Sequence, residues 1–186
     1  MKLETRRTLV AAGLAAACVT ACAPKEEAPP PATQPPAPVE LTVAMQTELA
    51  APAADVWKIV GDFGSLATYM DGVDSVSVEG EGVGAIRTIH LADGGSAVET
   101  VESHDDETMI LSYSSQEGPL PVEDYLSTMK VTALEDGRSR LDWSSKFKAK
   151  GVPDAEATGT LSGIYQTGFD GLARVLGPDD EETETK

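Results

Sequence analysis

Apolar and polar residues alternate along much of residues 40–150, which is the pattern of half-buried β-strands. The alternation breaks at turn signals such as Asp93-Gly94-Gly95-Ser96 and Asp136-Gly137, where glycine allows positive φ. The pattern therefore predicts a meander of antiparallel strands joined by short loops. The expected strands are residues 41–49, 73–79, 83–92, 96–102, 108–115, 126–134 and 139–149.

Three other segments have the spacing of helices. One helix is expected to begin within residues 51–55 and to end at Gly61, and a second short helix is expected over residues 62–70. A long helix is expected over residues 153–176, where Gly177-Pro178 ends it. Its apolar face is expected to contain Ala157, Leu161, Ile164, Gly168, Leu172 and Val175.

The long helix contains Gly159, Gly163, Gly168 and Gly171. Each glycine costs up to about 1 kcal/mol relative to alanine inside a helix. One explanation is that small residues let the helix lie close to another element. The other is that a long helix tolerates this weakness, and the sequence leaves both explanations open.

This order of elements predicts an α+β fold. We expect a curved seven-stranded antiparallel sheet wrapped around one long C-terminal helix, with two short helices after strand 1. A sheet that grips a single helix tends to leave space inside, and we expect this space to form a ligand cavity.

Residues 1–21 resemble a bacterial export signal. Lys2, Arg6 and Arg7 precede an apolar run that is too short to stay in a bilayer as a helix. Val19-Thr20-Ala21-Cys22 resembles the lipobox of lipoproteins, which predicts cleavage before Cys22 and lipidation of that residue. Export by the Sec or the twin-arginine (Tat) route stays open, and the alternative is an ordinary secretory signal with chance cysteines.

The segments around the folded domain complete this prediction. Residues 22–39 form a Pro/Ala-rich tether that could span roughly 50 Å, residues 40–177 form one domain, and residues 178–186 form a disordered acidic tail. We expect a protein anchored by lipid in a bacterial cell envelope. Ala23, by resemblance to sorted lipoproteins, implies the outer membrane facing the periplasm if the cell has one.

The net charge and the few cysteine and histidine residues limit which partners and cofactors the protein can bind. The chain has 14 basic and 31 acidic residues, a formal charge of −17, which disfavours nucleic acids and anionic lipid headgroups. Cys18 and Cys22 are the only cysteines, and we expect the two histidines, His90 and His104, to face solvent. We therefore predict no metal site and no cofactor, and the oligomeric state stays open.

Four stretches resemble the START-related helix-grip superfamily, also called SRPBCC. They are VWKIVGDF (56–63), GVGAIRT (82–88), EGPLPVEDY (117–125) and WSSKF (143–147). Residues 40–176 resemble its bacterial branch, known as polyketide cyclase/dehydrase and lipid-transport-like. The resemblance implies a helix-grip fold. It does not decide the activity, because the superfamily contains lipid carriers, hormone receptors, aromatic cyclases and chaperone cofactors.

The plant abscisic-acid receptors are distant relatives with the same order of elements. Their gate loop matches residues 91–97, which here include Gly94 and Gly95. Their latch loop matches residues 118–122, which here include Pro119, Leu120 and Pro121. The receptors' Ser-Gly-Leu-Pro and His-Arg-Leu sequences are absent, which argues against that hormone. We expect both loops to form the mouth of the cavity.

Strand alternation predicts which side chains face that cavity. A three-residue loop over residues 93–95 would pair Ile89 with Glu99 and place Arg87 diagonal to Glu99, whereas a two-residue loop would turn Glu99 outward. The family resemblance favours Glu99 inward. The expected lining is Trp57, Phe63, Leu66, Tyr69, Arg87, Ile89, Leu91, Glu99, Val101, Tyr113, Leu120, Tyr125, Ser127, Met129, Trp143, Phe147, Ile164 and Gly168.

Three hypotheses follow for function. An apolar cavity with few polar groups suits a non-catalytic protein that binds a lipid or another small hydrophobic molecule. Alternatively, Arg87, Glu99, Tyr113 and Tyr125 could perform acid–base chemistry in an enzyme resembling polyketide cyclases. In the third hypothesis the lipoprotein is structural or binds a partner, and its own side chains fill the cavity. The residues themselves also have simpler explanations: the aromatic residues can be ordinary core, and Arg87 and Glu99 can form a structural ion pair.

Overall fold

A computed structural model describes residues 39–177 of the chain. The predicted signal sequence, the lipidation site Cys22, residues 22–38 of the tether and the acidic tail lie outside the described residues. The elements are β1 (Leu41–Leu49), α1 (Ala53–Val60), α2 (Leu66–Tyr69), β2 (Val73–Glu79), β3 (Ile86–Leu91), β4 (Ser96–Asp105), β5 (Ile110–Glu117), β6 (Val122–Ala133), a 3₁₀ turn (Glu135–Gly137), β7 (Ser139–Ala149) and α3 (Asp154–Leu176).

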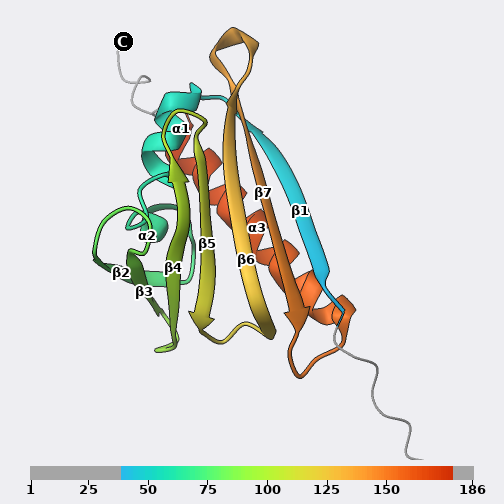
Figure 1. Cartoon of the computed structure of the whole chain (residues 1–186). Helices are drawn as coiled ribbons and strands as arrows, with labels where there is room; N and C mark the ends of the chain where they lie inside the picture. Colours follow the sequence, from blue (N-terminus) through green and yellow to red (C-terminus); the bar gives the residue numbers. More distant parts are fainter. Residues whose placement is uncertain (1–38, 178–186) are drawn as a thin grey trace, which may run out of the picture. The chain divides into compact units, whose positions relative to one another are not determined.

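The seven strands form one antiparallel sheet in the order β1-β7-β6-β5-β4-β3-β2. Figure 1 shows the long strands curving across α3, which packs against β1 and β7. The buried apolar side chains lie between the sheet and the three helices. The predicted helix-grip fold is therefore confirmed. Within residues 39–177, no helix combines the length and the apolar character needed to cross a membrane.

Some predicted boundaries were wrong. Strand β6 begins at Val122 rather than at residue 126, because a bulge between Glu123 and Leu126 lets the strand continue past its acidic residues. Asp124 within this bulge has φ 53°. The second helix covers only Leu66–Tyr69, since the Asp62 side chain accepts the N–H of Gly64 at 2.8 Å and forms a turn.

Helix α3 has the predicted length, but its buried face differs from the prediction. Tyr165 and Phe169 are buried, and neither was predicted to be on that face. Val175, which was predicted to be on it, is exposed. Tyr165 lies four residues after the buried Leu161, so the true face is a broader stripe than the one predicted.

The four helical glycines divide into two pairs. A Cβ at Gly171 would lie 1.7 Å from the carbonyl oxygen of Tyr69, and one at Gly168 would lie 2.6 Å from the Trp143 ring. A Cβ at Gly159 or Gly163 would meet no other atom of the described residues within 4 Å. Close packing of α3 against Trp143 and Tyr69 thus explains Gly168 and Gly171. For Gly159 and Gly163 the remaining explanation is that the long helix tolerates the low helix propensity of glycine.

Candidate functional site

Arg87 and Glu99 form a buried ion pair between β3 and β4. Arg87 Nε donates to Glu99 Oε2 at 2.6 Å, and Arg87 Nη1 donates to the carbonyl oxygen of Phe63 at 3.2 Å. The guanidinium carbon lies 4.2 Å from the centroid of the Phe63 ring and 4.8 Å from that of Tyr113. Glu99, a backbone carbonyl and two aromatic rings therefore all engage this cation, which is the arrangement expected of a structural pair.

The pair also corrects the predicted register. Glu99 faces inward as the resemblance implied, but Arg87 lies directly opposite it instead of diagonally. The turn consists of residues 92–94, because the N–H of Leu91 donates to the carbonyl oxygen of Gly95 at 2.9 Å. Both loop alternatives drawn from the sequence were therefore wrong.

Burial and mutual attraction have opposing effects on this pair. Burial raises the pKa of Glu99, and Arg87 only partly offsets that rise. For Arg87, burial lowers the pKa, but Glu99 and the nearby Tyr113 and Tyr69 outweigh burial and the net pKa is raised. The cation thus stays charged, and Glu99 is the member whose charge is costly to bury.

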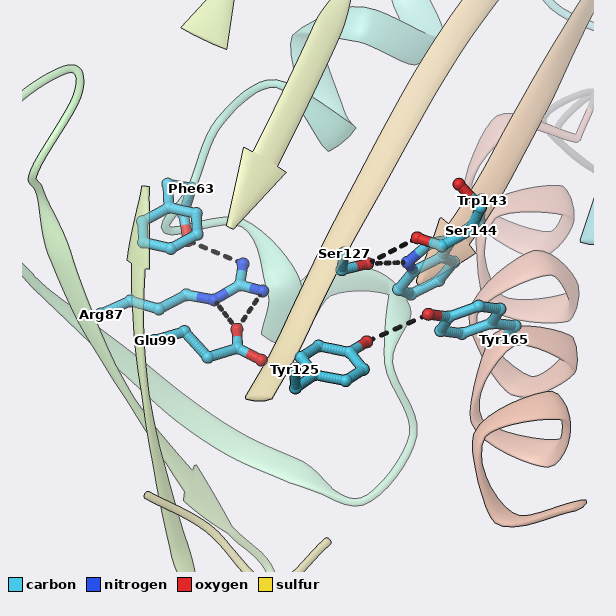
Figure 2. Close-up of polar contacts among 8 residues, drawn as sticks. All are labelled: Phe63, Arg87, Glu99, Tyr125, Ser127, Trp143, Ser144 and Tyr165. Atoms are coloured by element: carbon cyan, nitrogen blue, oxygen red, sulfur yellow. Dashed lines mark hydrogen bonds and ion pairs between the residues drawn. The ribbon is translucent and has the colours of Figure 1, made fainter. Parts of the chain in front are cut away.

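A second buried polar group lies between β6, β7 and α3, and Figure 2 shows its side chains directed toward one another. The hydroxyls of Tyr125 and Tyr165 lie 3.0 Å apart. Trp143 Nε1 donates to Ser127 Oγ at 2.9 Å, and Ser127 Oγ donates to the carbonyl oxygen of Ser144 at 3.3 Å. The Trp143 ring stacks on Tyr165 with centroids 4.3 Å apart.

Ser145 completes this group. It lies opposite Ser127 in the β6–β7 register and is buried, yet its Oγ has no hydrogen-bond partner among the described residues. We call Tyr125, Ser127, Ser145 and Tyr165 the hydroxyl cluster.

The buried tyrosines are neutral at physiological pH. Burial raises the pKa of Tyr69 to about 12 and also raises the pKa of Tyr113, Tyr125 and Tyr165. Each phenol therefore keeps its proton and can donate a hydrogen bond.

An open cleft of about 500 Å³ borders the hydroxyl cluster, with Tyr125 as the one member of the cluster in its lining. We call it the latch cleft, because the predicted latch forms one side of it. It lies at the end of β5 and the beginning of β6. Its lining consists of Ser114, Ser115, Gln116, Glu117, Gly118, Leu120, Val122, Glu123, Asp124, Tyr125 and Lys150.

The predicted gate and latch loops lie at the same end of the sheet. Strand β4 begins just after Gly94 and Gly95, and its Val98 pairs with Glu117 at the end of β5. A Cβ at Gly118 would lie 3.1 Å from the Cβ of Ala97, so the latch packs closely on the beginning of β4.

A smaller, more apolar cleft of about 280 Å³ lies near α1. Its lining includes Phe63, Ala85, Val101 and His104. The prediction that His104 is a solvated surface residue was wrong. Its ring stacks on Trp57 with centroids 5.3 Å apart, and its Nε2 lies 3.1 Å from the carbonyl oxygen of Gly61. His90 is exposed, as predicted.

The predicted lining residues mostly lie in the interior. Leu91, Leu120 and Ile164 are half-buried and the other fifteen are buried. Leu120 and Tyr125 contribute to the latch cleft, and Phe63 and Val101 to the smaller one. Sequence reasoning missed Tyr165 and Ser145. The signals were present, since Tyr165 is four residues from Leu161 and Ser145 shares strand parity with Trp143.

Comparison with solved structures finds proteins with a similar fold. An uncharacterized protein from Bacillus thuringiensis is 28% identical, with a TM-score of 0.69 over 73% of this chain and 98% of that chain. The protein XoxI from Bacillus cereus is also 28% identical, with a TM-score of 0.69 over 77% of this chain and 99% of that chain.

The Zhui aromatase/cyclase from Streptomyces sp. R1128 shares the fold, with 17% identity and a TM-score of 0.60 over 74% of this chain and 92% of that chain. The family described as polyketide cyclase/dehydrase and lipid transport matches residues 40–177. Because that match covers most of the sequence, the chain belongs to the polyketide cyclase/dehydrase and lipid transport family.

Proposed function

We propose that the domain binds a small hydrophobic molecule without transforming it, and that the molecule enters through the latch cleft. The observation that carries this proposal is the cleft itself, whose volume of about 500 Å³ lies within the usual range for ligand pockets and whose largely polar lining includes the apolar side chains of Leu120, Val122 and Tyr125. Tyr125 joins the cleft to the buried hydroxyl cluster. Membership of a family whose description includes lipid transport supports the same ligand class.

The gate and latch loops are proposed to control this entrance. Leu120 lines the cleft, and the close contact between Gly118 and Ala97 couples the latch to the beginning of β4. A ligand that separates these loops would have to displace this contact, so its binding is expected to be slower than simple diffusion.

Apolar molecules are expected to copurify with the protein and to appear in a solvent extract analysed by mass spectrometry. Added long-chain ligands are expected to raise the melting temperature. A ligand at 100 times its Kd contributes about 2.7 kcal/mol, which corresponds to roughly 5–10 °C for a domain of this size. The proposal fails if the extract contains no apolar molecule and a panel of alkyl ligands leaves the melting temperature unchanged.

A charge placed in the cleft tests the position of the entrance, and the same charge placed elsewhere is the matched control. Leu120→Lys is expected to abolish the ligand-induced shift, because it places an ammonium group where the apolar body would lie. Leu126→Lys makes the same change at an exposed position of β6 and is expected to leave the shift intact. Equal loss in both variants would contradict an entrance at the latch cleft.

We further propose that acylation of Cys22 holds the domain on a bacterial membrane outside the cytoplasm, facing the periplasm where the cell has an outer membrane. The lipobox-like Val19-Thr20-Ala21-Cys22 supports this proposal, and the Pro/Ala-rich segment that follows would act as the spacer.

Cys22→Ser is expected to move the protein from the membrane fraction to the soluble fraction and to abolish incorporation of radiolabelled palmitate. Cys18→Ser, a cysteine substitution in the same signal, is expected to change neither result. Retention of Cys22→Ser in the membrane would show that another segment provides the anchor.

A further inference from the structure

We propose that the hydroxyl cluster selects the polar end of the ligand, accepting an uncharged hydrogen-bond acceptor such as a ketone or ester carbonyl and rejecting a carboxylate. This inference rests on the proposed function, since the ligand's apolar body is taken to occupy the latch cleft. It adds the chemistry of the head group that the body carries.

The two tyrosines provide an unused donor. Each phenol has one hydrogen, and the 3.0 Å contact between Tyr125 and Tyr165 consumes only one of the two. When Tyr165 donates in this pair, the second hydrogen stays on Tyr125, which lines the cleft, and can bind an oxygen atom that arrives there. Burial raises the pKa of both phenols, so neither loses its proton at physiological pH.

Ser145 provides a second unused donor. Its side chain is 3% exposed, and its Oγ lies close enough to the Tyr165 phenol to lower that group's pKa but forms no hydrogen bond of full geometry with any described residue. Ser145 faces the same interior as Ser127, which lies directly opposite it and already donates to the carbonyl oxygen of Ser144. A buried hydroxyl without a partner lowers stability, and a ligand oxygen at this point would remove that penalty.

The charges around the site oppose an anionic ligand. Arg87 is the only buried cation among residues 39–177, and Glu99 together with two aromatic rings already engages it. The lining of the latch cleft contains Glu117, Glu123 and Asp124 against the single base Lys150. A carboxylate would therefore enter a negatively charged cleft and meet neutral donors instead of a counter-ion.

The test compares three ligands with the same ten-carbon body: 2-decanone, decanoate and decylammonium. Their dissociation constants are measured by isothermal titration calorimetry on the whole protein carrying Cys22→Ser. We expect 2-decanone to bind most tightly, with decanoate and decylammonium each at least about tenfold weaker. Tyr165→Phe and Ser145→Ala are each expected to weaken 2-decanone about threefold to tenfold.

Ser139→Ala is the matched control. Ser139 is also a buried serine of β7 whose Oγ has no partner in the described part of the chain, but it lies six residues, roughly 20 Å, from Ser145. It is expected to leave binding unchanged. Neither serine variant is expected to impair folding, since each removes a buried unpaired hydroxyl.

The outcomes separate the two proposals. If decanoate or decylammonium binds as tightly as 2-decanone, or if neither Tyr165→Phe nor Ser145→Ala weakens 2-decanone more than Ser139→Ala does, the selection by the hydroxyl cluster is refuted and the binding function stands. If none of the three ligands binds, the proposed function fails and the inference fails with it.

Discussion

Replacing Arg87 by methionine is expected to lower the free energy of unfolding by about 3–5 kcal/mol, which urea denaturation would measure. The substitution leaves the Glu99 carboxylate buried without a counter-charge, since Arg87 provides its hydrogen bond at 2.6 Å. Replacing both residues, as Arg87→Met with Glu99→Leu, is expected to recover most of this loss. The double variant removes both buried charges, and an apolar pair of similar volume is often neutral or stabilising.

Two comparisons test this explanation. Arg140→Met removes an arginine from the more exposed pair with Asp142, at 3.1 Å, and is expected to change stability by no more than about 0.5 kcal/mol. If Arg87→Met changes the free energy of unfolding equally little, the buried charge of Glu99 does not need Arg87. If the double variant is as unstable as Arg87→Met alone, the buried charge of Glu99 is not the cause of the lost stability.

The pH dependence of the stability of these variants tests the same explanation independently. Burial raises the pKa of Glu99 in the folded protein, and loss of Arg87 removes the influence that opposes this rise. A carboxyl whose folded pKa is raised stabilises the fold below its unfolded pKa, and that contribution is lost as pH rises through the folded pKa. The stability gap between the single and double variants is therefore expected to narrow as pH falls toward about 4.5.

Strand alternation was sufficient to predict the sheet, because a half-buried strand must place every second side chain in the core. It could not fix the register between β3 and β4. Asp93-Gly94-Gly95 allows a turn at more than one position, and the choice depends on the Asp93 side chain accepting the N–H of Gly95 at 2.8 Å. A one-residue difference in the loop decided which residue lies opposite Glu99.

Contacts between residues distant in sequence account for the other errors. The acidic residues around His104 indicate an exposed turn, but Trp57 in α1 covers the histidine ring. The Trp57 indole N–H also donates to Asp106 at 2.8 Å, which fixes the turn against the helix. Such packing has no local signal, and for the same reason the sequence predicted interior residues without showing which of them border a cleft.

Gly171→Ala is expected to destabilise the protein by about 3 kcal/mol, although alanine is the better helix former. The added Cβ would lie 1.7 Å from the carbonyl oxygen of Tyr69, and this obstacle is backbone, which cannot rotate away as a side chain can. Helix α3 must therefore move away from α2. Urea denaturation measures the loss, and circular dichroism checks that the helix itself is retained.

Gly163→Ala is the control within the same helix. Gly163 is exposed and its Cβ would meet no atom of the described residues within 4 Å, so helix propensity alone should act and stabilise the protein by up to about 1 kcal/mol. Equal stabilisation by both substitutions would show that α2 yields easily to α3. A loss of stability in Gly171→Ala together with a gain in Gly163→Ala would establish close approach to α2 as the reason for Gly171.

Because Tyr165 lies less than two turns before Gly171, a displaced helix should also separate its hydroxyl from Tyr125. Gly171→Ala is thus expected to weaken 2-decanone binding as well, and Gly163→Ala to preserve it.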